Sequence, residues 1–133
     1  MVVTYLDSSA IVKLVHAEPG SQPLRTWLGE RSDISWVSSV LAEVESFRAL
    51  ARYAPAAVGG LPAVLEVIDL VDLSAGIRVF ARAVRPVSIR SLDVIHLATA
   101  LQLRDELDAF VTYDKRLAGA AVTAGLAVDA PGQ

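Results

Sequence analysis

Short apolar runs alternate with helical stretches along the whole chain, and this alternation limits the possible folds more than any other feature. Residues 2–6 form a β-branched and aromatic run typical of a buried strand, and residues 9–17 then have the pattern of a helix. When each strand is followed by a helix, successive strands can run parallel while the helices cover both faces of the sheet. We therefore predict an α/β fold with three layers, α/β/α, around a central, mainly parallel sheet.

The remaining elements are predicted from apolar periodicity and from the residues that bound it. Further strands are expected at residues 34–37, 67–73, 109–112 and 126–128. Further helices are expected at residues 22–30, 74–84, 91–107 and 115–124, with a longer one that Ser38 or Ser39 caps and that ends near Tyr53. A short or broken helix is expected at residues 55–67, because this segment contains Gly59, Gly60 and Pro62.

Composition favours one folded domain, residues 1–133, without covalent cross-links. Apolar residues make up 53% of the chain and charged residues 20%, so a full hydrophobic core is possible and no segment is polar enough to predict disorder. The absence of cysteine excludes disulfides and thiolate metal sites. Asp7 interrupts the first apolar run, unlike a signal peptide, and no apolar run reaches the roughly 18 residues of a membrane span. We therefore expect a soluble, cytoplasmic protein.

Four acidic residues carry the functional information: Asp7, Glu45, Asp93 and Asp114. Ligands bind open parallel sheets beyond the carboxyl ends of the strands, and Asp7 and Asp114 follow two such ends. Clustered carboxylates repel one another unless a cation lies between them, so the set predicts a divalent metal site. Such sites commonly support phosphoryl or phosphodiester transfer. Each acid alone also fits a plain structural role, as a helix cap or a solvated side chain, and only the combination is specific.

Two acids compete for the position on the helix that ends near Tyr53. The buried stripe of this helix is predicted from its apolar residues, Val40, Leu41, Val44, Phe47 and Ala51. Glu43 and Glu45 lie on opposite sides of this stripe, each displaced from it around the helix axis by about 100°, the angle between successive residues. Periodicity alone does not choose between them.

Polar neighbours of these acids have both structural and functional interpretations. Ser8, Ser91 and Thr112 are hydroxyls that would either orient the carboxylates or cap helices, with Ser91 as the expected cap of the helix at residues 91–107. His96 lies three residues after Asp93, and an Asp-x-x-His pair can bind zinc. No second histidine is near, so a packed or hydrogen-bonded helix residue is favoured for His96.

Basic residues are unevenly placed, although the net charge of −3 argues against general nucleic-acid binding. Six arginines form two groups: Arg48 and Arg52 on one helix face, and Arg78, Arg82, Arg85 and Arg90 in a stretch without acids. An acidic metal centre with an arginine rim would suit a polyanionic substrate. Judged from the arginines alone, a solvated surface is the simpler interpretation.

Taken together, these residues resemble the PIN-domain family, and within it the VapC-type toxins of toxin–antitoxin pairs, over essentially the whole chain. The strongest motif is Arg90-Ser-Leu-Asp93-Val-Ile-His-Leu-Ala-Thr-Ala, which is close to the family's helix around an acidic metal ligand. Three segments are similar to the family's other acidic positions: Tyr5-Leu-Asp7-Ser-Ser-Ala, Ser39-Val-Leu-Ala-Glu-Val-Glu45-Ser-Phe-Arg and Phe110-Val-Thr-Tyr-Asp114-Lys-Arg-Leu. The spacing from Glu45 to Arg48 fits the family pattern and favours Glu45 over Glu43.

The resemblance implies a PIN-like fold and a metal-dependent endoribonuclease, with Mg²⁺ as the cofactor and Mn²⁺ as a substitute. The implied catalytic and metal-binding residues are Asp7, Glu45, Asp93 and Asp114, and the hydroxyls beside them are Ser8, Ser91 and Thr112. Some members carry a further acid where this chain has Thr112, so the resemblance leaves open whether one metal binds or two. The implied partners are an RNA substrate, a VapB-like antitoxin and a second copy of the chain in a homodimer.

Two other classes of function remain as alternatives. The first is a metal-dependent phosphatase or phosphotransferase with Asp7 as the nucleophile, although such enzymes commonly carry a second acid where this chain has Ser9. The second is a catalytically silent PIN-like binding module, against which the presence of all four acids counts.

Overall fold

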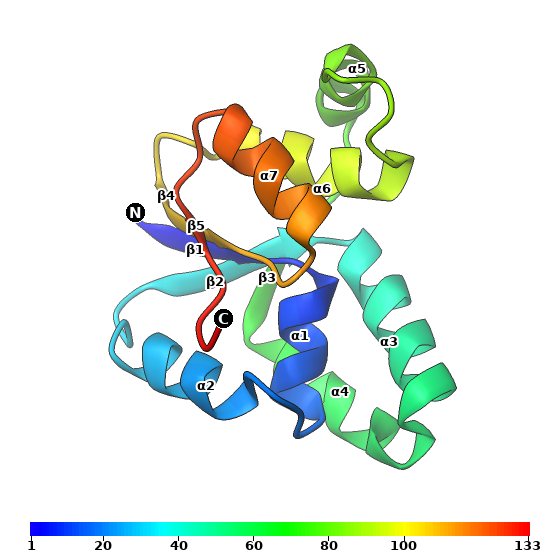
Figure 1. Cartoon of the computed structure of the whole chain (residues 1–133), viewed down its shortest axis with the longest axis vertical. Helices are drawn as coiled ribbons and strands as arrows, with labels where there is room; N and C mark the ends of the chain where they lie inside the picture. Colours follow the sequence, from blue (N-terminus) through cyan, green and yellow to red (C-terminus); the bar gives the residue numbers. More distant parts are fainter.

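The computed structural model describes residues 1–133 and has a sheet of five parallel strands at its centre (Figure 1). The strands are β1 (Val3–Leu6), β2 (Ser35–Ser39), β3 (Ile68–Val71), β4 (Leu107–Val111) and β5 (Val128–Asp129). Their order across the sheet is β3-β2-β1-β4-β5, and every neighbouring pair is parallel. β1 and β4 therefore lie side by side, although most of the chain separates them in sequence.

Helices cover both faces of this sheet, which confirms the predicted three-layer α/β/α fold (Figure 1). One face carries α1 (Ser8–Val15), α2 (Ser21–Gly29), α3 (Leu41–Tyr53) and α4 (Leu61–Glu66), with the 3-10 helix η1 (Pro55–Gly60) joining α3 to α4. The other face carries α6 (Ser91–Gln102) and α7 (Lys115–Thr123), and α5 (Ala75–Ala83) packs on α6. Because side chains alternate along a strand, Leu6 enters the core under α1 to α4, while Tyr5 enters the core under α6 and α7.

The boundaries of α6 and β4 differ from the predictions. The cap position of α6 is Arg90, so Ser91 is the first helical residue and not the cap. The helix ends at Gln102, well before residue 107, and residues 103–106 form a turn. This turn contains no Gly or Pro, so the sequence carries no signal for the stop. β4 then starts at Leu107, earlier than predicted, because Leu107 pairs with the start of β1.

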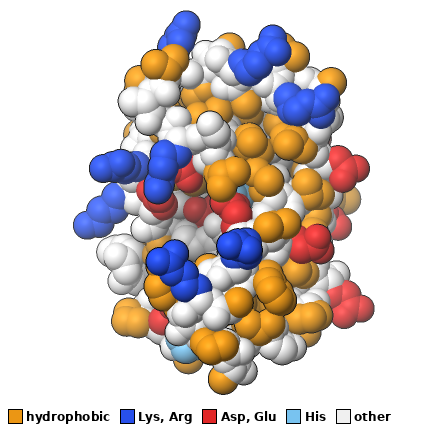
Figure 2. All heavy atoms as spheres, turned by 90° about the vertical axis from the view of Figure 1, so that its right-hand side faces the viewer, with side chains coloured by type: hydrophobic (Ala, Val, Ile, Leu, Met, Phe, Trp, Pro, Cys, Tyr) orange, Lys and Arg blue, Asp and Glu red, His pale blue; other side chains and the backbone are white.

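The buried face of α3 is not the stripe predicted from its large apolar residues. Val44 is 55% exposed and Phe47 50% exposed, whereas Ala42, Ser46 and Leu50 are buried. Two of these buried side chains are small, which lets α3 pack closely on α1, and the Ser46 hydroxyl donates to the Ala42 carbonyl within the helix. The predicted stripe is therefore wrong. Figure 2 faces the side on which α3 lies and shows apolar side chains exposed there.

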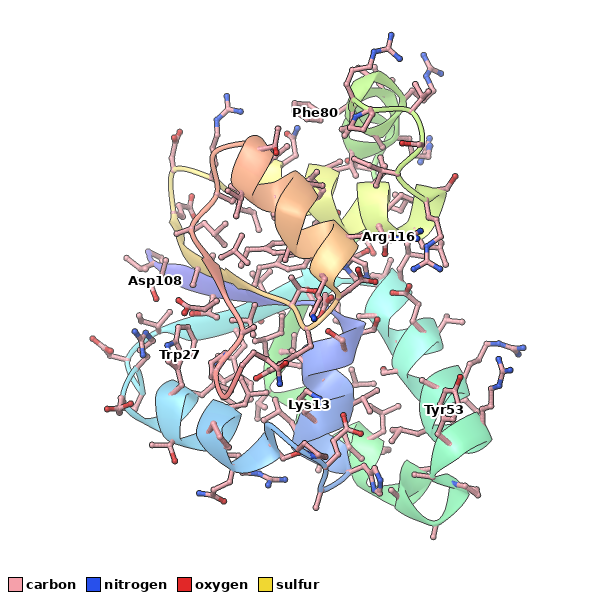
Figure 3. All side chains as sticks on the ribbon, in the orientation of Figure 1. Lys13, Trp27, Tyr53, Phe80, Asp108 and Arg116 are labelled. Atoms are coloured by element: carbon pink, nitrogen blue, oxygen red, sulfur yellow. The ribbon has the colours of Figure 1, made fainter.

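The helices are short and are held to the sheet by side-chain contacts. On α2, Trp27 packs against the core under α1 to α4, and the Arg31 guanidinium lies 3.8 Å from the centre of its ring (Figure 3). Arg31 also forms an ion pair at 3.5 Å with Asp108 on β4. None of the helices has the length and apolar character needed to cross a membrane.

Candidate active site

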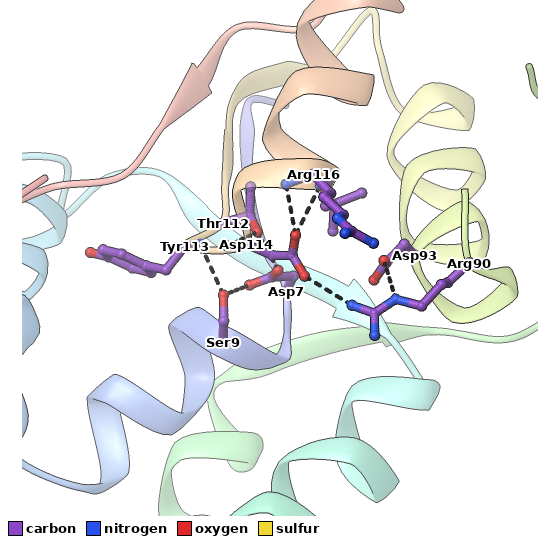
Figure 4. A network of polar contacts seen from close by, with 9 residues as sticks. Asp7, Ser9, Arg90, Asp93, Thr112, Tyr113, Asp114 and Arg116 are labelled. Atoms are coloured by element: carbon purple, nitrogen blue, oxygen red, sulfur yellow. Dashed lines mark hydrogen bonds and ion pairs between the residues drawn. The ribbon is translucent and has the colours of Figure 1, made fainter. Parts of the chain in front are cut away.

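Three of the predicted acids come together at the carboxyl edge of the sheet (Figure 4). Asp7 directly follows β1 and Asp114 lies just beyond β4, so the pairing of these two strands brings both residues to the same edge. Asp93 reaches the same region from the first turn of α6. The order of residues in the chain does not show that Asp93 lies beside the other two acids, whereas the structure does show it.

Asp7 is almost completely buried, and both of its carboxylate oxygens accept hydrogen bonds. Oδ1 accepts from the Ser9 hydroxyl at 2.6 Å and from the Ala10 backbone N–H at 3.1 Å, which caps α1. Oδ2 accepts from the Thr112 hydroxyl at 2.5 Å. Burial raises the pKa of Asp7 above its ordinary value, although His96 and these hydrogen bonds oppose the rise. The fold thus fixes a buried carboxylate that forms no ion pair.

Thr112 links Asp7 to Asp114 through its side-chain hydroxyl. Its Oγ1 donates to Asp7 and accepts from the Asp114 backbone N–H at 3.1 Å. Asp114 Oδ1 accepts from the backbone N–H groups of Arg116 and Leu117 at 2.9 and 3.0 Å, which caps α7. Oδ1 of Asp114 therefore caps the helix, and Oδ2 is the oxygen that is left for the site.

A hydroxyl omitted from the predicted site, Ser9, holds Asp7 from the other side. Ser9 Oγ donates to Asp7 and accepts from the Tyr113 backbone N–H at 2.9 Å, which joins α1 to the segment after β4. Ser8 and Ser91 were expected either to orient the acids or to cap helices, and neither is among the groups that hydrogen-bond the carboxylates of Asp7 and Asp114. An Asp that caps a helix lies closest to groups two and three residues further on, which explains why Ser9 contacts Asp7 and Ser8 does not.

Arg90 lies between the other two acids of the edge (Figure 4). Its Nε is 3.5 Å from Asp93 Oδ2, and its Nη2 is 3.5 Å from Asp114 Oδ2. Burial, and then the Asp114 charge, raise the pKa of Asp93, while Arg90 opposes the rise. The two carboxylates therefore repel each other, and a largely exposed guanidinium offsets part of this repulsion.

The structure favours Glu45 over Glu43 for the acidic position on α3. Glu43 is exposed, whereas Glu45 is half-buried and its Oε1 lies 2.6 Å from Nε2 of His96 on α6. His96 is itself buried, with Nδ1 at 2.6 Å from the Tyr5 hydroxyl. The prediction that His96 is a hydrogen-bonded helix residue is confirmed. Its contact with Glu45 was missed, because helix periodicity does not show which two helices face each other.

A groove of about 1070 Å³ runs beside these acids, between α1 and α3. Charged residues of both signs line it: Lys13, Glu18, Glu45, Arg48, Arg52, Arg90 and Asp114. Figure 2 shows acidic side chains at the centre of a hollow with basic side chains around it. Arg78 and Arg82, which were also candidates for the rim, line a separate pocket between α5 and α6. An acidic centre with a partly basic rim suits a polyanionic ligand.

The donors of this site have the chemistry of a divalent cation site, but their side chains do not close around one point. Only carboxylate oxygens are offered, and these are the ligands that Mg²⁺ and Mn²⁺ prefer. However, no group of three or more His, Asp or Glu side chains lies close enough together to hold one ion. Arg90 contacts both Asp93 and Asp114 instead. A divalent ion therefore fits the donor set, provided that it displaces the Arg90 guanidinium.

Comparison with known proteins agrees with this architecture. The family profile described as PIN domain matches residues 4–122. Over 131 residues the chain is 44% identical to the protein named Ribonuclease VapC35 from Mycobacterium tuberculosis, with 97% of each chain covered. The structure of FitAcB from Neisseria gonorrhoeae has a TM-score of 0.69 and 18% identity, covering 95% of this chain and 96% of that chain. A toxin–antitoxin complex from Klebsiella pneumoniae has a TM-score of 0.63 and 16% identity, covering 85% and 88%.

Proposed function

This chain belongs to the PIN-domain family, and we propose that it is a divalent-metal-dependent endoribonuclease, the toxin of a toxin–antitoxin pair. One observation carries the proposal: acids that follow β1, follow β4 and open α6 meet at one sheet edge, beside a groove with basic residues on its rim. The relative named Ribonuclease VapC35 supports the reaction class, because the 44% identity extends over nearly the full length of both chains.

In this proposal Asp7 and Asp93 hold the best-bound ion, and Glu45 and Asp114 complete its surroundings directly or through water. A bound Mg²⁺, or Mn²⁺ in its place, would lower the pKa of an attacking water and stabilise the leaving oxygen of the phosphodiester. Two hydroxyls already hold the Asp7 carboxylate in one orientation. Its position is therefore set before an ion or a substrate arrives, which reduces the reorganisation needed for reaction.

Unpaired RNA is the substrate that suits the groove. Arg48 and Arg52 on α3 line it beside the acids. Basic side chains of this kind contact phosphates and position a nucleic-acid backbone without reading its sequence. A duplex hides its base edges in a deep, narrow groove, so single-stranded or looped RNA is the expected target. We place the protein in the cytoplasm, where such RNA is found.

The two alternative functions find no support in the site. A phosphatase with Asp7 as the nucleophile commonly uses a second acid two residues further on, whereas this chain has Ser9 there, and the Ser9 hydroxyl donates to Asp7 Oδ1 at 2.6 Å. A catalytically silent binding module would not need to keep a carboxylate buried without an ion pair, because burial of such a charge is unfavourable.

The groove side of the molecule also offers a surface for a protein partner. Val44 and Phe47 are about half exposed on α3, and Phe47 lines the groove. Exposed apolar patches beside polar residues commonly mark interfaces. The Klebsiella protein that shares this fold was solved in a toxin–antitoxin complex. We infer that a VapB-like antitoxin covers this surface and brings a basic group to the acids, and that the chain binds it as a homodimer.

Co-expression with the small protein encoded beside it should yield a stable complex in which RNA cleavage is suppressed. Phe47→Ser should weaken this complex, because it removes apolar surface beside the groove. Val122→Ser, which changes an exposed apolar residue on α7, is the matched control and should leave the complex intact. Size-exclusion chromatography measures both. A chain that stays monomeric, takes up no partner and is harmless when expressed alone would contradict the toxin proposal.

Glu45→Gln should lower the rate of RNA cleavage by about 10- to 100-fold, since changing a group that supports a metal site typically has an effect of this size. Glu43→Gln, an identical change two residues away on the exposed face of α3, should leave cleavage unchanged. Cleavage of a labelled single-stranded RNA measures the two rates. The reverse order of effects would show that the acidic position on α3 is Glu43.

A further inference from the structure

His96 joins the core of the fold to the acidic centre. It lies on α6 with 1% of its surface exposed, and its two ring nitrogens contact residues from two other elements. Nδ1 is 2.6 Å from the Tyr5 hydroxyl on β1, and Nε2 is 2.6 Å from Glu45 Oε1 on α3. One chain of hydrogen bonds therefore runs from the sheet through α6 to α3.

The core fixes the Tyr5 end of this chain. Tyr5 is fully buried, and its ring stacks on Phe110 with the ring centres 5.0 Å apart. The His96 ring meets Tyr5 edge-on, with centres 5.8 Å apart and an interplanar angle of 83°. Side chains in such close packing keep one rotamer. The direction of the His96 Nε2 atom is thus set by the core and not by Glu45.

The proton positions along the chain follow from the chemistry of its two ends. An ionised Glu45 carboxylate can only accept, so the bond to it requires a hydrogen on His96 Nε2. In a neutral imidazole Nδ1 is then the acceptor, and the Tyr5 hydroxyl donates to it.

Glu45 depends on such a contact more than the acids at the sheet edge. Asp7 and Asp114 are tied to backbone N–H groups as helix caps. Glu45 has a longer side chain, and the contact with His96 is the only hydrogen bond or ion pair of that side chain. Without this contact the long side chain would be free to take other rotamers, including ones that turn its carboxylate toward solvent. The His96 contact opposes that rotation.

We propose that His96 is a positioning residue that holds the Glu45 carboxylate at the acidic centre, and that Tyr5 fixes the orientation and tautomer of the imidazole. This inference rests on the proposed ribonuclease function, in which Glu45 supports the metal site. His96 itself does not touch the substrate or the ion.

Two substitutions of His96 separate this role from simple packing. The amide of Asn ends near the position of Nδ1, so His96→Asn keeps a polar partner for Tyr5 and removes the donor to Glu45. The longer Gln reaches the position of Nε2, so His96→Gln keeps a donor for Glu45. His96→Asn should lower kcat by about 10- to 100-fold with little change in KM, and should weaken Mn²⁺ binding measured by calorimetry. His96→Gln should retain most of both.

The Glu45→Ala background tests whether His96 acts through Glu45. In that background His96→Asn should cause no further loss of kcat, because residues that act as one unit are not additive. Glu43→Ala, on the exposed side of the same helix turn, provides the matched background in which the full loss should persist. Two results would overturn the proposal. One is a further loss of kcat when His96→Asn is added to Glu45→Ala. The other is a loss of kcat in both His96→Asn and His96→Gln that parallels the fall in their melting temperatures.

Nitrogen-15 NMR of the wild-type protein tests the inference without any activity assay and without a variant that must fold. The expected result is a hydrogen on His96 Nε2. A hydrogen found only on Nδ1 would overturn the proposal. If the Nε2 hydrogen is present and Mn²⁺ binding weakens in His96→Asn, the positioning role stands even if no RNA is cleaved. In that case the ribonuclease function fails and the positioning role does not.

Discussion

Asp93→Asn is expected to abolish RNA cleavage while the chain remains folded. The change keeps the shape of the side chain and removes a charge that the proposed ion requires. The rate should fall by more than about 100-fold, since residues that only orient a metal ligand already contribute 10- to 100-fold. The ion pair lost with Arg90 is long and its guanidinium is largely exposed, so it contributes little to stability.

Cleavage measured at limiting Mg²⁺, together with a thermal melt, checks this expectation. Asp105→Asn is the matched control, because Asp105 is an exposed acid in the turn after α6, at the other end of that helix. It should cleave at the wild-type rate. Normal cleavage by Asp93→Asn at limiting Mg²⁺ would remove Asp93 from the site. If Asp93→Asn and Asp105→Asn both lose cleavage, the loss is not specific to an acid at the proposed site.

Asp7→Asn is expected to be inactive and yet more stable than the wild type in the absence of divalent metal. Burial raises the pKa of Asp7 in the folded protein even though its hydrogen bonds oppose the rise, so the ionised form is unfavourable there. The folded state then binds this proton more tightly than the unfolded state does. The wild type therefore loses stability as pH rises from the ordinary carboxyl pKa through the raised one. Asn carries no charge and avoids this loss.

The stability gain of Asp7→Asn should be fully present at neutral pH and should vanish at acid pH, below the ordinary carboxyl pKa. Each kcal/mol of gain corresponds to about 4 °C in Tm for a chain of this size. Millimolar Mg²⁺ or Mn²⁺ should reverse the order, because an ion that binds only the folded wild type stabilises it by mass action. Thermal melts at two pH values, with and without metal, give the four comparisons. A variant less stable than the wild type in metal-free buffer at neutral pH would contradict the interpretation of Asp7.

The layers of the fold could be predicted from the sequence, because alternating strands and helices leave few arrangements other than a covered parallel sheet. The stop of α6 at Gln102 could not, since it is set by the pairing of β4 with β1 and not by a local Gly or Pro. The buried face of α3 was missed for a related reason. Ala42 and Ser46 are buried because α1 approaches α3 closely and leaves room only for small side chains. The periodicity of the large apolar residues gives no sign of this approach.

The acids of the site were found from their types and their places in the chain, but their environment was not. The adjacency of β1 and β4, which brings Asp7 to Asp114, depends on the strand order of the whole sheet. The contact between Glu45 and His96 depends on how α3 and α6 face each other across the end of the sheet. Long-range contacts of this kind leave no local pattern in one sequence.

Cleavage of a single-stranded RNA by the purified protein, with Mg²⁺ and then with an excess of chelator, tests the proposed function most directly. We expect cleavage with Mg²⁺, none with the chelator, and recovery when Mg²⁺ or Mn²⁺ is added back. Asp93→Asn, prepared in the same way, should stay inactive throughout, which excludes a contaminating nuclease. Cleavage that persists in the chelator, or an Asp93→Asn preparation as active as the wild type, would contradict a ribonuclease site built on these carboxylates.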